Sequence, residues 1–417
     1  MVEVDSRAES YQARYSTARL RPFTTAASIP QTELLELMLG VYTVDRLVPR
    51  NKRGWRRRLE LRFPVLSLDR WSAVRTALEE LLASCMGDDV VLHLRHRKDG
   101  ATHADARAQA FALEPPAPVA VGLLSDGLDS LCGAAHALSS DPGRFAFVSV
   151  LTNSRRKRRV ADIRTNLKHV FGDRIEYRDL DVHIKGAPPK QERTQRSRTL
   201  LAVTAGITVA AGYGASQVEV YENGMGILNL PVPGLQMPHE SSQVLHPRNL
   251  DLWRRAVEPL LGSIRVAYPN RWLTKTQLCQ RLPATLRNSI RATSSCDSPQ
   301  RRDAHADCGV CGSCTMRRIA LQGAGLASHD LVYSSAPPAP SDFAASDVFP
   351  YHVDLLARAL ASKDPWPELV RLQPTLSSSV QGFDDPTERA HAVDATIQLL
   401  RRHVADVGAL EDFPRAV

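Results

Sequence analysis

The stretch Val119-Ala-Val-Gly-Leu-Leu-Ser-Asp-Gly-Leu-Asp-Ser130 decides the fold class of this chain. Its first six residues form an unbroken apolar run, which is typical of a strand buried on both faces of a parallel sheet. A Gly-containing turn follows and leads directly into a helical pattern over 128–138. Such a turn points backbone N–H groups and the positive end of the helix dipole at one place. This predicts a phosphate-binding loop; an ordinary βα turn with a serine cap is the alternative.

The side chains of this turn suit a nucleotide. The hydroxyl groups of Ser125 and Ser130 are expected to donate hydrogen bonds to phosphate oxygens, and Asp129 is expected to orient a Mg²⁺ ion that bridges those oxygens. The expected cofactor-binding residues are Ser125, Asp126, Gly127, Leu128, Asp129 and Ser130.

Strands and helices alternate after this turn. Strands are predicted over 119–124, 145–151, 174–184 and 217–221, and helices over 128–138, 161–170 and from 194 to 212 or 214. This βαβα rhythm predicts an α/β fold with a doubly wound parallel sheet, in which ligands bind outside the carboxyl ends of the strands.

The rest of the chain divides around this sheet. Residues 1–112 read as a small α/β domain with strands over 59–65 and 88–94 and a helix over 71–82. Glu114-Pro-Pro-Ala-Pro118 marks a boundary. We place the core domain at 117–333, a Pro/Ser-rich linker at 334–345 and a helical extension at 346–417.

Four of the seven cysteines cluster near the end of the core domain: Cys296, Cys308, Cys311 and Cys314. Gly309 and Gly312 allow tight turns between them, and thiolates at this C-x11-C-x2-C-x2-C spacing suit one tetrahedral Zn²⁺. A closed four-sulfur site leaves no open position for catalysis, so its expected role is structural. An iron–sulfur cluster and replacement of one sulfur by His305 are the alternatives.

Composition sets wider limits. The net charge of +8 and pI of about 9.2 suit an anionic partner. Much of the excess lies in a run from Arg46 to Arg62 and in Arg155-Arg-Lys-Arg-Arg159, which could each meet RNA, an acidic protein or a nucleotide, or simply be solvated. The polar start lacks the pattern of a signal peptide, and the apolar run at 200–215 is too short for a membrane span. We expect a cytoplasmic protein without a membrane partner.

Ser125-Asp-Gly-Leu-Asp-Ser130 resembles the Ser-Gly-Gly-x-Asp-Ser PP-loop of ATP pyrophosphatases, which holds the pyrophosphate released when ATP adenylates a substrate. Asp126 departs from that pattern, because a glycine is usual at its position. Together with the cysteine cluster, the loop resembles the 7-cyano-7-deazaguanine synthase (QueC-like) family over about 119–333. The resemblance implies a PP-loop (HUP) fold, an ATP-dependent C–N bond-forming ligase, and ATP, Mg²⁺ and Zn²⁺ as cofactors.

Two further stretches resemble segments that contact the nucleotide in this family. Glu192-Arg-Thr-Gln-Arg-Ser-Arg-Thr199 resembles an arginine-bearing helix start, which implies catalytic roles for Arg196 and Arg198; structural salt bridges are the alternative. Leu273-Thr-Lys-Thr-Gln277 resembles the family's Thr-Lys helix start, which implies that Lys275 reaches a phosphate. A simple capping box is the alternative for this second stretch.

The expected substrate side of the cleft follows the fourth strand, at Glu222, Asn223 and Gly224. The resemblance implies that a deazaguanine-type carboxylate is adenylated there and that an amine then displaces AMP. Ammonia would give an amide or a nitrile, and a protein amine would give a conjugate. A chain with outer domains of this kind is similar to QueC-like components of bacterial anti-phage systems, which implies operon-encoded protein partners. A tRNA-modifying PP-loop enzyme and a non-catalytic nucleotide-binding subunit are the alternatives, and nucleic acid is the less favoured partner.

Overall fold

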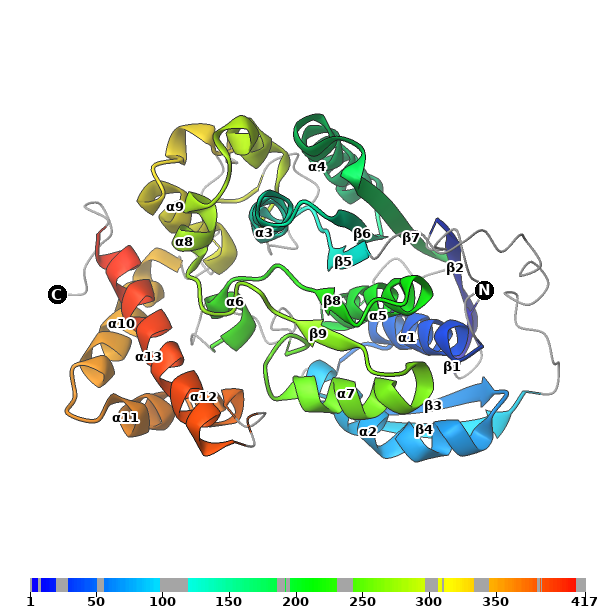
Figure 1. The fold of residues 1–417 in the computed structure, drawn as a ribbon. Helices are drawn as coiled ribbons and strands as arrows, with labels where there is room; N and C mark the ends of the chain where they lie inside the picture. Colours follow the sequence, from blue (N-terminus) through cyan, green and yellow to red (C-terminus); the bar gives the residue numbers. More distant parts are fainter. Residues whose placement is uncertain are drawn as a thin grey trace.

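A mainly parallel sheet forms the centre of the protein (Figure 1). This computed structural model describes residues 2–6, 9–19, 29–50, 56–97, 119–185, 192, 196–230, 243–296, 307–309, 311–333, 345–380, 383 and 385–409. Five parallel strands run in the order β7-β6-β5-β8-β9. They are β5 (Val119–Leu123), β6 (Arg144–Leu151), β7 (Ile175–Lys185), β8 (Gln217–Glu219) and β9 (Arg265–Ala267). The strand order reverses at β5, which is the position where α/β sheets bind ligands.

The predicted parallel sheet is confirmed, but it is wider than predicted. The sequence predicts four of its strands; β9 has only three residues and shows no pattern of its own. The strands β1 (Val2–Ser6) and β2 (Glu9–Arg19) extend the sheet beyond β7 as an antiparallel pair. Thus the first residues of the chain belong to the central sheet.

Helices cover both faces of this sheet because its strands are apolar on both sides. On β6, Phe145 and Phe147 belong to the hydrophobic cluster shared with α3 (Leu128–Ser140) and α4 (Ser154–Phe171). Ala146 and Val148 belong to the cluster on the opposite face, shared with α5 (Arg196–Tyr213). This alternation with period two explains the unbroken apolar runs in the sequence.

Helix α4 begins earlier than predicted. The sequence predicts a helix over 161–170, whereas α4 begins at Ser154 and includes the second basic run. The side chain of Asn153 caps it by accepting a hydrogen bond from the backbone N–H of Arg156 at 2.8 Å. Arginine and lysine favour helices, so the run continues the helix rather than preceding it. Its buried side is formed by Val160, Ile163 and Leu167.

The N-terminal unit packs beneath α5 (Figure 1). Its elements are α1 (Ile29–Leu47), β3 (Arg58–Val65), α2 (Leu68–Met86) and β4 (Asp89–His96). The strands β3 and β4 pair in parallel, α1 packs on α5, and α2 packs on α7 (Asn249–Leu261). One hydrophobic cluster joins this unit to the central sheet. The boundary predicted at 114–118 lies outside the described residues.

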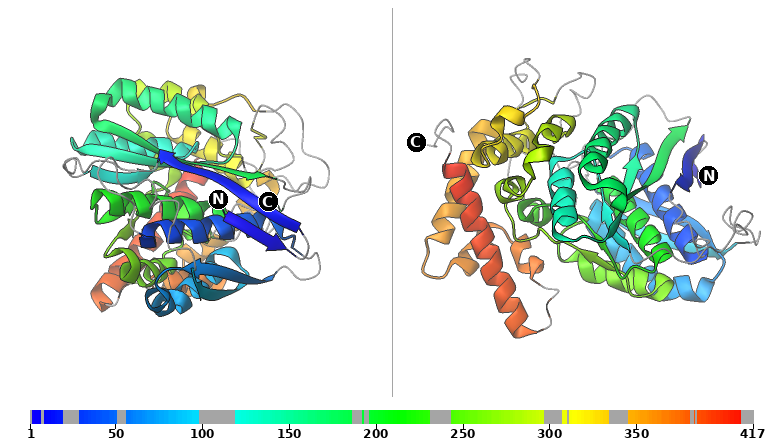
Figure 2. Two further views of the ribbon diagram at one scale, coloured as in Figure 1. Left: turned by 90° about the vertical axis from the view of Figure 1, so that its right-hand side faces the viewer. Right: turned by 45° about the horizontal axis from the view of Figure 1, so that its top comes forward.

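The tail is a group of helices on the opposite side of the molecule from β1 and β2 (Figures 1 and 2). It contains α10 (Ala345–Leu360), α11 (Pro365–Leu372), α12 (Thr375–Ser379) and α13 (Pro386–Gly408). These helices pack against α6 (Gly224–Leu228) and α9 (Gly312–Gly323). The predicted linker lies outside the described residues except for its last one.

Shorter elements complete the described chain: η2 (Gly172–Arg174), α8 (Lys275–Gln280), η3 (Ala284–Ala292) and η5 (Ala327–His329). Across the described residues, every helix is too short or too polar to cross a membrane.

Candidate nucleotide cleft and metal centre

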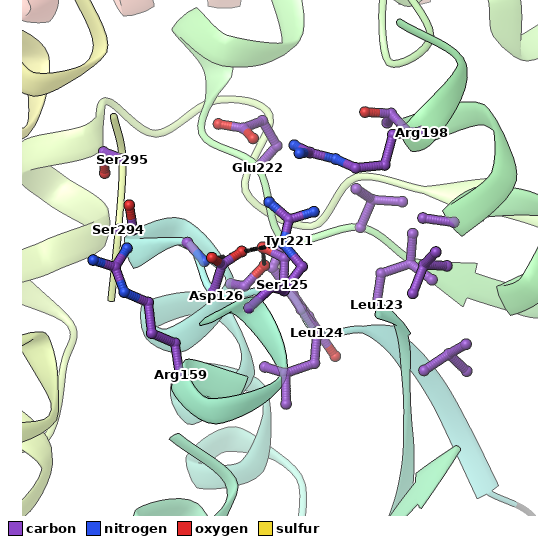
Figure 3. A pocket seen from close by; sticks show the side chains of 18 of the residues that line it. Leu123, Leu124, Ser125, Asp126, Arg159, Arg198, Tyr221, Glu222, Ser294 and Ser295 are labelled. Carbon is purple, nitrogen blue, oxygen red and sulfur yellow. Dashed lines mark hydrogen bonds and ion pairs between the residues drawn. The ribbon is translucent and has the colours of Figure 1, made fainter. Parts of the chain in front are cut away.

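A cleft of about 600 Å³ opens at the carboxyl ends of β5 and β6 (Figure 3). It lies at the position where the strand order reverses. The polar residues that line it are Ser125, Asp126, Gly127, Ser130, Asn153, Ser154, Arg155, Arg156, Arg159, Arg198, Thr199, Glu222, Ser294, Ser295, Cys296 and Asp307.

Three helices begin at the wall of this cleft. Ser130 lies in the first turn of α3, Ser154 is the first residue of α4, and Arg198 lies in the first turn of α5. The first-turn N–H groups of each helix have no partner within the helix, and they place a partial positive charge there. Their common direction follows from the parallel sheet, because every strand enters its helix at the same edge. The cleft therefore favours an anion.

The loop after β5 brings its two serines together. The hydroxyl oxygens of Ser125 and Ser130 lie 2.8 Å apart, and the backbone N–H of Gly127 donates to Ser125 Oγ at 3.1 Å. Both hydroxyl groups line the cleft. Leu128 is fully buried beneath the loop and, unlike the two serines, does not line the cleft.

Asp126, which departs from the PP-loop pattern, has two partners. Its carboxylate forms an ion pair with Arg156 Nε at 2.8 Å, and these side chains are 13% and 15% exposed respectively. Its backbone carbonyl accepts a hydrogen bond from the N–H of Ser294 at 2.7 Å. The arginine neutralises the acid, so the carboxylate does not stand alone against an anion in the loop.

Asp129 lies behind the loop rather than in the lining of the cleft. Its Oδ2 accepts hydrogen bonds from Lys275 Nζ at 2.7 Å and from Asn223 Nδ2 at 3.2 Å. Burial alone would raise the pKa of the Asp129 carboxyl, but Lys275, Glu222 and Asn223 together lower it below its usual value. Lys275 thus contacts a carboxylate instead of the cleft.

The capping box expected at Thr274 is present. The Thr274 hydroxyl accepts from the N–H of Gln277 at 3.2 Å, and the Gln277 side chain accepts from the N–H of Thr274 at 3.1 Å. This cap begins α8 and sets Lys275 in its first turn, beside Asp129. The capping box is therefore present, and it positions Lys275 beside Asp129 rather than in the lining of the cleft.

The three residues predicted on the substrate side separate. Glu222 lines the cleft, and burial together with the neighbouring Asp129 raises the pKa of Glu222 well above its usual value. Asn223 instead caps α6 by accepting from the N–H groups of Met225 and Gly226 at 3.0 and 3.2 Å.

Gly224 is a packing position. A Cβ atom at Gly224 would lie 2.3 Å from the carbonyl oxygen of Arg271 and 2.5 Å from a methyl group of Leu399 in α13. The glycine therefore allows the tail to approach α6, and it does not line the cleft.

The two arginines predicted on α5 point in different directions. Arg198 lines the cleft, whereas Arg196 is buried and donates to the carbonyl of Met86 in the N-terminal unit. Residues two apart on a helix do not share a face, which the repeated arginine pattern conceals. Burial, with the nearby Arg50, lowers the pKa of Arg196 to about 10.

The second basic run is divided by helical periodicity. Arg155, Arg156 and Arg159 line the cleft, whereas Lys157 is exposed and pairs with Asp181 at 3.4 Å. The run is therefore divided between the wall of the cleft and the solvent-exposed surface. The sequence shows that the run is basic, but it does not show which of its side chains face the cleft. That depends on the residue at which α4 begins.

The four clustered cysteines come together as predicted. The sulfur atoms of Cys296, Cys308, Cys311 and Cys314 all lie within 4.8 Å of one another. Four thiolates on one Zn²⁺ would be about 3.8 Å apart, given Zn–S bonds of about 2.3 Å. The N–H of Cys308 donates to Cys296 Sγ at 3.4 Å, and Gly309 has a φ of +77°. The cluster could hold a metal ion such as zinc; His305 lies outside the described residues.

Two further residues at the cleft, Ser294 and Asp307, were not predicted from the sequence. Ser294 contacts the loop after β5, and Asp307 accepts hydrogen bonds from Ser294 and Arg159. Ser294 carries no local signal, and Asp307 is marked only by its place next to Cys308. Both were detectable only through contacts between distant parts of the chain.

Comparison with known proteins does not identify a family for this chain. A scan against protein-family models finds no match, and a search of curated proteins finds no relative of this chain. Its function must therefore be inferred from the cleft and the cysteine cluster.

Proposed function

We propose that this protein is a PP-loop ATP pyrophosphatase of the QueC-like type, which adenylates a 7-deazaguanine carboxylate and passes the acyl group to an amine. One observation carries the proposal. The loop Ser125–Ser130 opens into a cleft of about 600 Å³ at the point where the strand order reverses, beside the N-termini of α4 and α5. A nucleotide polyphosphate matches that combination of hydroxyl groups, helix N-termini and arginines.

In the proposed reaction, a carboxylate oxygen attacks the α-phosphorus of ATP, and the bond to the pyrophosphate leaving group breaks. Ser125 and Ser130 would hold the pyrophosphate through their hydroxyl groups, and the backbone N–H groups of the first α3 turn would add to them. Arg198 and Arg155 line the same cleft and would stabilise the charge that builds up on the phosphates. An amine then attacks the acyl carbon, and AMP leaves.

In this proposal, Mg²⁺ is assigned to the carboxyl groups beside the loop. The carboxyl groups of Asp129 and Glu222 interact by a hydrogen bond when Glu222 is protonated, and Lys275 Nζ contacts Asp129 Oδ2 at 2.7 Å. A bound Mg²⁺ would take the place of the proton between the two carboxyl groups. Among the described residues, no donor reaches the buried Oδ1 of Asp129. Asp129 and Glu222 would hold Mg²⁺, which when bound neutralises charge on phosphate oxygens.

The other expected catalytic residues take supporting roles in this proposal. Lys275 fixes the carboxylate of Asp129, and Arg196 anchors the beginning of α5 to the N-terminal unit. The cysteine cluster would bind Zn²⁺ and hold the segment of Cys296 at the wall of the cleft. The acceptor amine, from ammonia or a protein in an anti-phage complex, is open to experiment.

Pyrophosphate release tests the proposal. Purified protein with ATP, Mg²⁺ and 7-carboxy-7-deazaguanine should release pyrophosphate and AMP, whereas omission of the carboxylate should abolish release. Ser130→Ala should lower kcat/KM about 10- to 100-fold, because a hydrogen bond to a charged group contributes about 1.5–3 kcal/mol. Ser139→Ala is the matched control, since Ser139 lies on the same helix and donates to Ala135 at 2.8 Å.

The other outcomes assign the cleft differently. Release that requires RNA rather than the carboxylate would identify a tRNA-modifying enzyme. Nucleotide binding without release, for every substrate tried, would identify a non-catalytic subunit. That outcome would fit the pairing of Asp126 with Arg156. Intact-mass spectrometry of the protein co-expressed with its operon neighbours would reveal a protein acceptor as a mass shift.

A further inference from the structure

Asp307 joins the cysteine cluster to the cleft. It directly precedes Cys308, and its side chain is 4% exposed. Its carboxylate accepts hydrogen bonds from Ser294 Oγ at 2.8 and 3.0 Å and from the backbone N–H of Ser295 at 3.1 Å. These bonds hold Ser294 and Ser295, which directly precede Cys296 of the four-cysteine cluster.

The same carboxylate holds an arginine of the cleft wall. Arg159 on α4 donates to Asp307 Oδ1 from both terminal nitrogens, at 3.3 and 3.4 Å. Arg159 lines the cleft and is 19% exposed. Figure 3 shows Arg159 and Ser294 on the same side of Asp126, opposite Arg198. Asp307 thus sets where this guanidinium stands relative to an anion.

A second connection runs through the backbone. The N–H of Ser294 donates to the carbonyl of Asp126 at 2.7 Å, so the segment fixed by Asp307 also holds the phosphate-binding loop. Cys296 and Cys308 lie one at each end of this arrangement. The N–H of Cys308 donates to Cys296 Sγ at 3.4 Å, and because neither cysteine is in a disulfide, a metal ion bound by the four sulfur atoms would add a stronger link between them. A metal ion bound there would therefore restrain the position of Asp307, which directly precedes Cys308.

We propose that Asp307 is a positioning residue that couples metal occupancy of the four-cysteine site to anion binding in the cleft. With the metal bound, Asp307 holds Arg159 and segment 294–295 against the loop Ser125–Ser130. Without it, Cys308 is released, Asp307 moves with its neighbour, and the loop and the arginine lose their support. The inference rests on the proposed function only in taking a polyphosphate as the anion.

Thermodynamic reciprocity makes this coupling measurable without catalysis. If Zn²⁺ raises the affinity for pyrophosphate by some factor, pyrophosphate must raise the affinity for Zn²⁺ by the same factor. We expect about tenfold, which lies within the usual range for coupled sites. The measurements are calorimetric titration of pyrophosphate into zinc-loaded and zinc-depleted protein, and equilibrium competition for Zn²⁺ with a chelator, with and without pyrophosphate.

The decisive variant is Asp307→Asn, which keeps the shape of the side chain and removes its charge. It should retain Zn²⁺ and lose the coupling in both titrations. Asp181→Asn is the matched control, because Asp181 also pairs with a cation of α4, Lys157, but lies outside the lining of the cleft. That control should keep the full coupling.

Ser294→Ala covers the case in which Asp307→Asn fails to fold. This variant keeps the backbone bond to Asp126 and removes the hydroxyl bond to Asp307, so the coupling should fall partly while Zn²⁺ remains bound. Full coupling in a zinc-loaded Asp307→Asn or Ser294→Ala protein would overturn the inference. Pyrophosphate binding without any effect of Zn²⁺ would also overturn it and leave the proposed function intact, whereas no pyrophosphate binding at all would refute the proposed function itself.

Discussion

Arginine–carboxylate pairs connect distant segments in two regions of this protein, and the two regions differ in burial. In the N-terminal unit, Asp45 and Asp88 are fully buried, and the side chains of Arg50 and Arg57 are 3% and 6% exposed. Around the cleft, Arg156 and Arg159 are 15% and 19% exposed, and both line the cavity. Arginine–carboxylate pairs are thus buried in the N-terminal unit, whereas those at the cleft are accessible to a ligand.

Hydrogen bonds join distant segments within the sealed network. Asp88 accepts two bonds from Arg50, at 2.7 and 2.9 Å, and further bonds from the side chain and backbone of Arg57. Asp45 also accepts from Ser197 at 2.6 Å, next to Arg198 of the cleft. A sealed network is a permanent scaffold, whereas arginines at a cleft can exchange a carboxylate for an incoming phosphate.

The largest effect should come from breaking the sealed network. Asp88→Asn leaves the two buried arginines Arg50 and Arg57 to share the carboxylate of Asp45, and this loss of one buried negative charge should lower the free energy of unfolding by about 3–5 kcal/mol. The neighbouring Asp89→Asn is the control, because Asp89 pairs with Arg56 on the surface, where both side chains are more than half exposed. Its effect should stay below about 1 kcal/mol in urea unfolding. Equal effects of the two substitutions would show that burial does not distinguish the pairs.

This network also explains what the sequence could not predict about the first basic run. A run from Arg46 to Arg62 indicates an exposed basic surface, because the partners of its arginines lie far along the chain. Asp88 is more than thirty residues from Arg57, and Ser197 is 152 residues from Asp45. Charge runs are local, whereas burial is decided by tertiary contacts.

Local patterns predicted the strands β5 to β8, the loop after β5 and the cysteine cluster, because apolar runs, turns and ligand spacing are read over a few residues. They failed where the direction of a side chain on its helix, or a contact between residues far apart in the chain, determines the role of a residue. Arg196 and Arg198 look equivalent in sequence but diverge on the helix. Asp307 meets Arg159 across 148 residues, a contact that no short pattern encodes.

A smaller effect should appear as a pH dependence at the cleft. The pKa of Glu222 is raised by burial and by Asp129, so the fold favours its protonated form. Its contribution to stability is therefore complete below about pH 4.5 and is lost as the pH rises through the raised pKa. Glu222→Gln keeps the shape of the protonated group, so it should match the native protein at pH 4.5 and exceed its stability at pH 8 by on the order of 1 kcal/mol.

Urea unfolding at several pH values would measure this difference. The exposed Glu258→Gln is the control and should change nothing in the pH profile, since Glu258 is 46% exposed and pairs with Arg254 at the surface. The carboxyl of Asp88 should behave oppositely to that of Glu222. Burial would raise its pKa, but Arg57 and Arg50 outweigh burial and lower it, so its contribution persists until the pH falls below the ordinary range near 4.

The smallest effect tests whether the cleft pairs are exchangeable. Asp126→Gly removes the carboxylate beside the loop and releases Arg156 toward the anion, so pyrophosphate should bind about fivefold tighter, or by roughly 1 kcal/mol. Stability should change by less than about 1 kcal/mol, because both partners are partly exposed. Asp126→Asn removes the charge without adding the backbone freedom of glycine. A similar gain in pyrophosphate affinity in both variants would therefore assign the effect to the charge. Weaker binding in both would mean that the pair organises the loop, which would make it a scaffold like the sealed network.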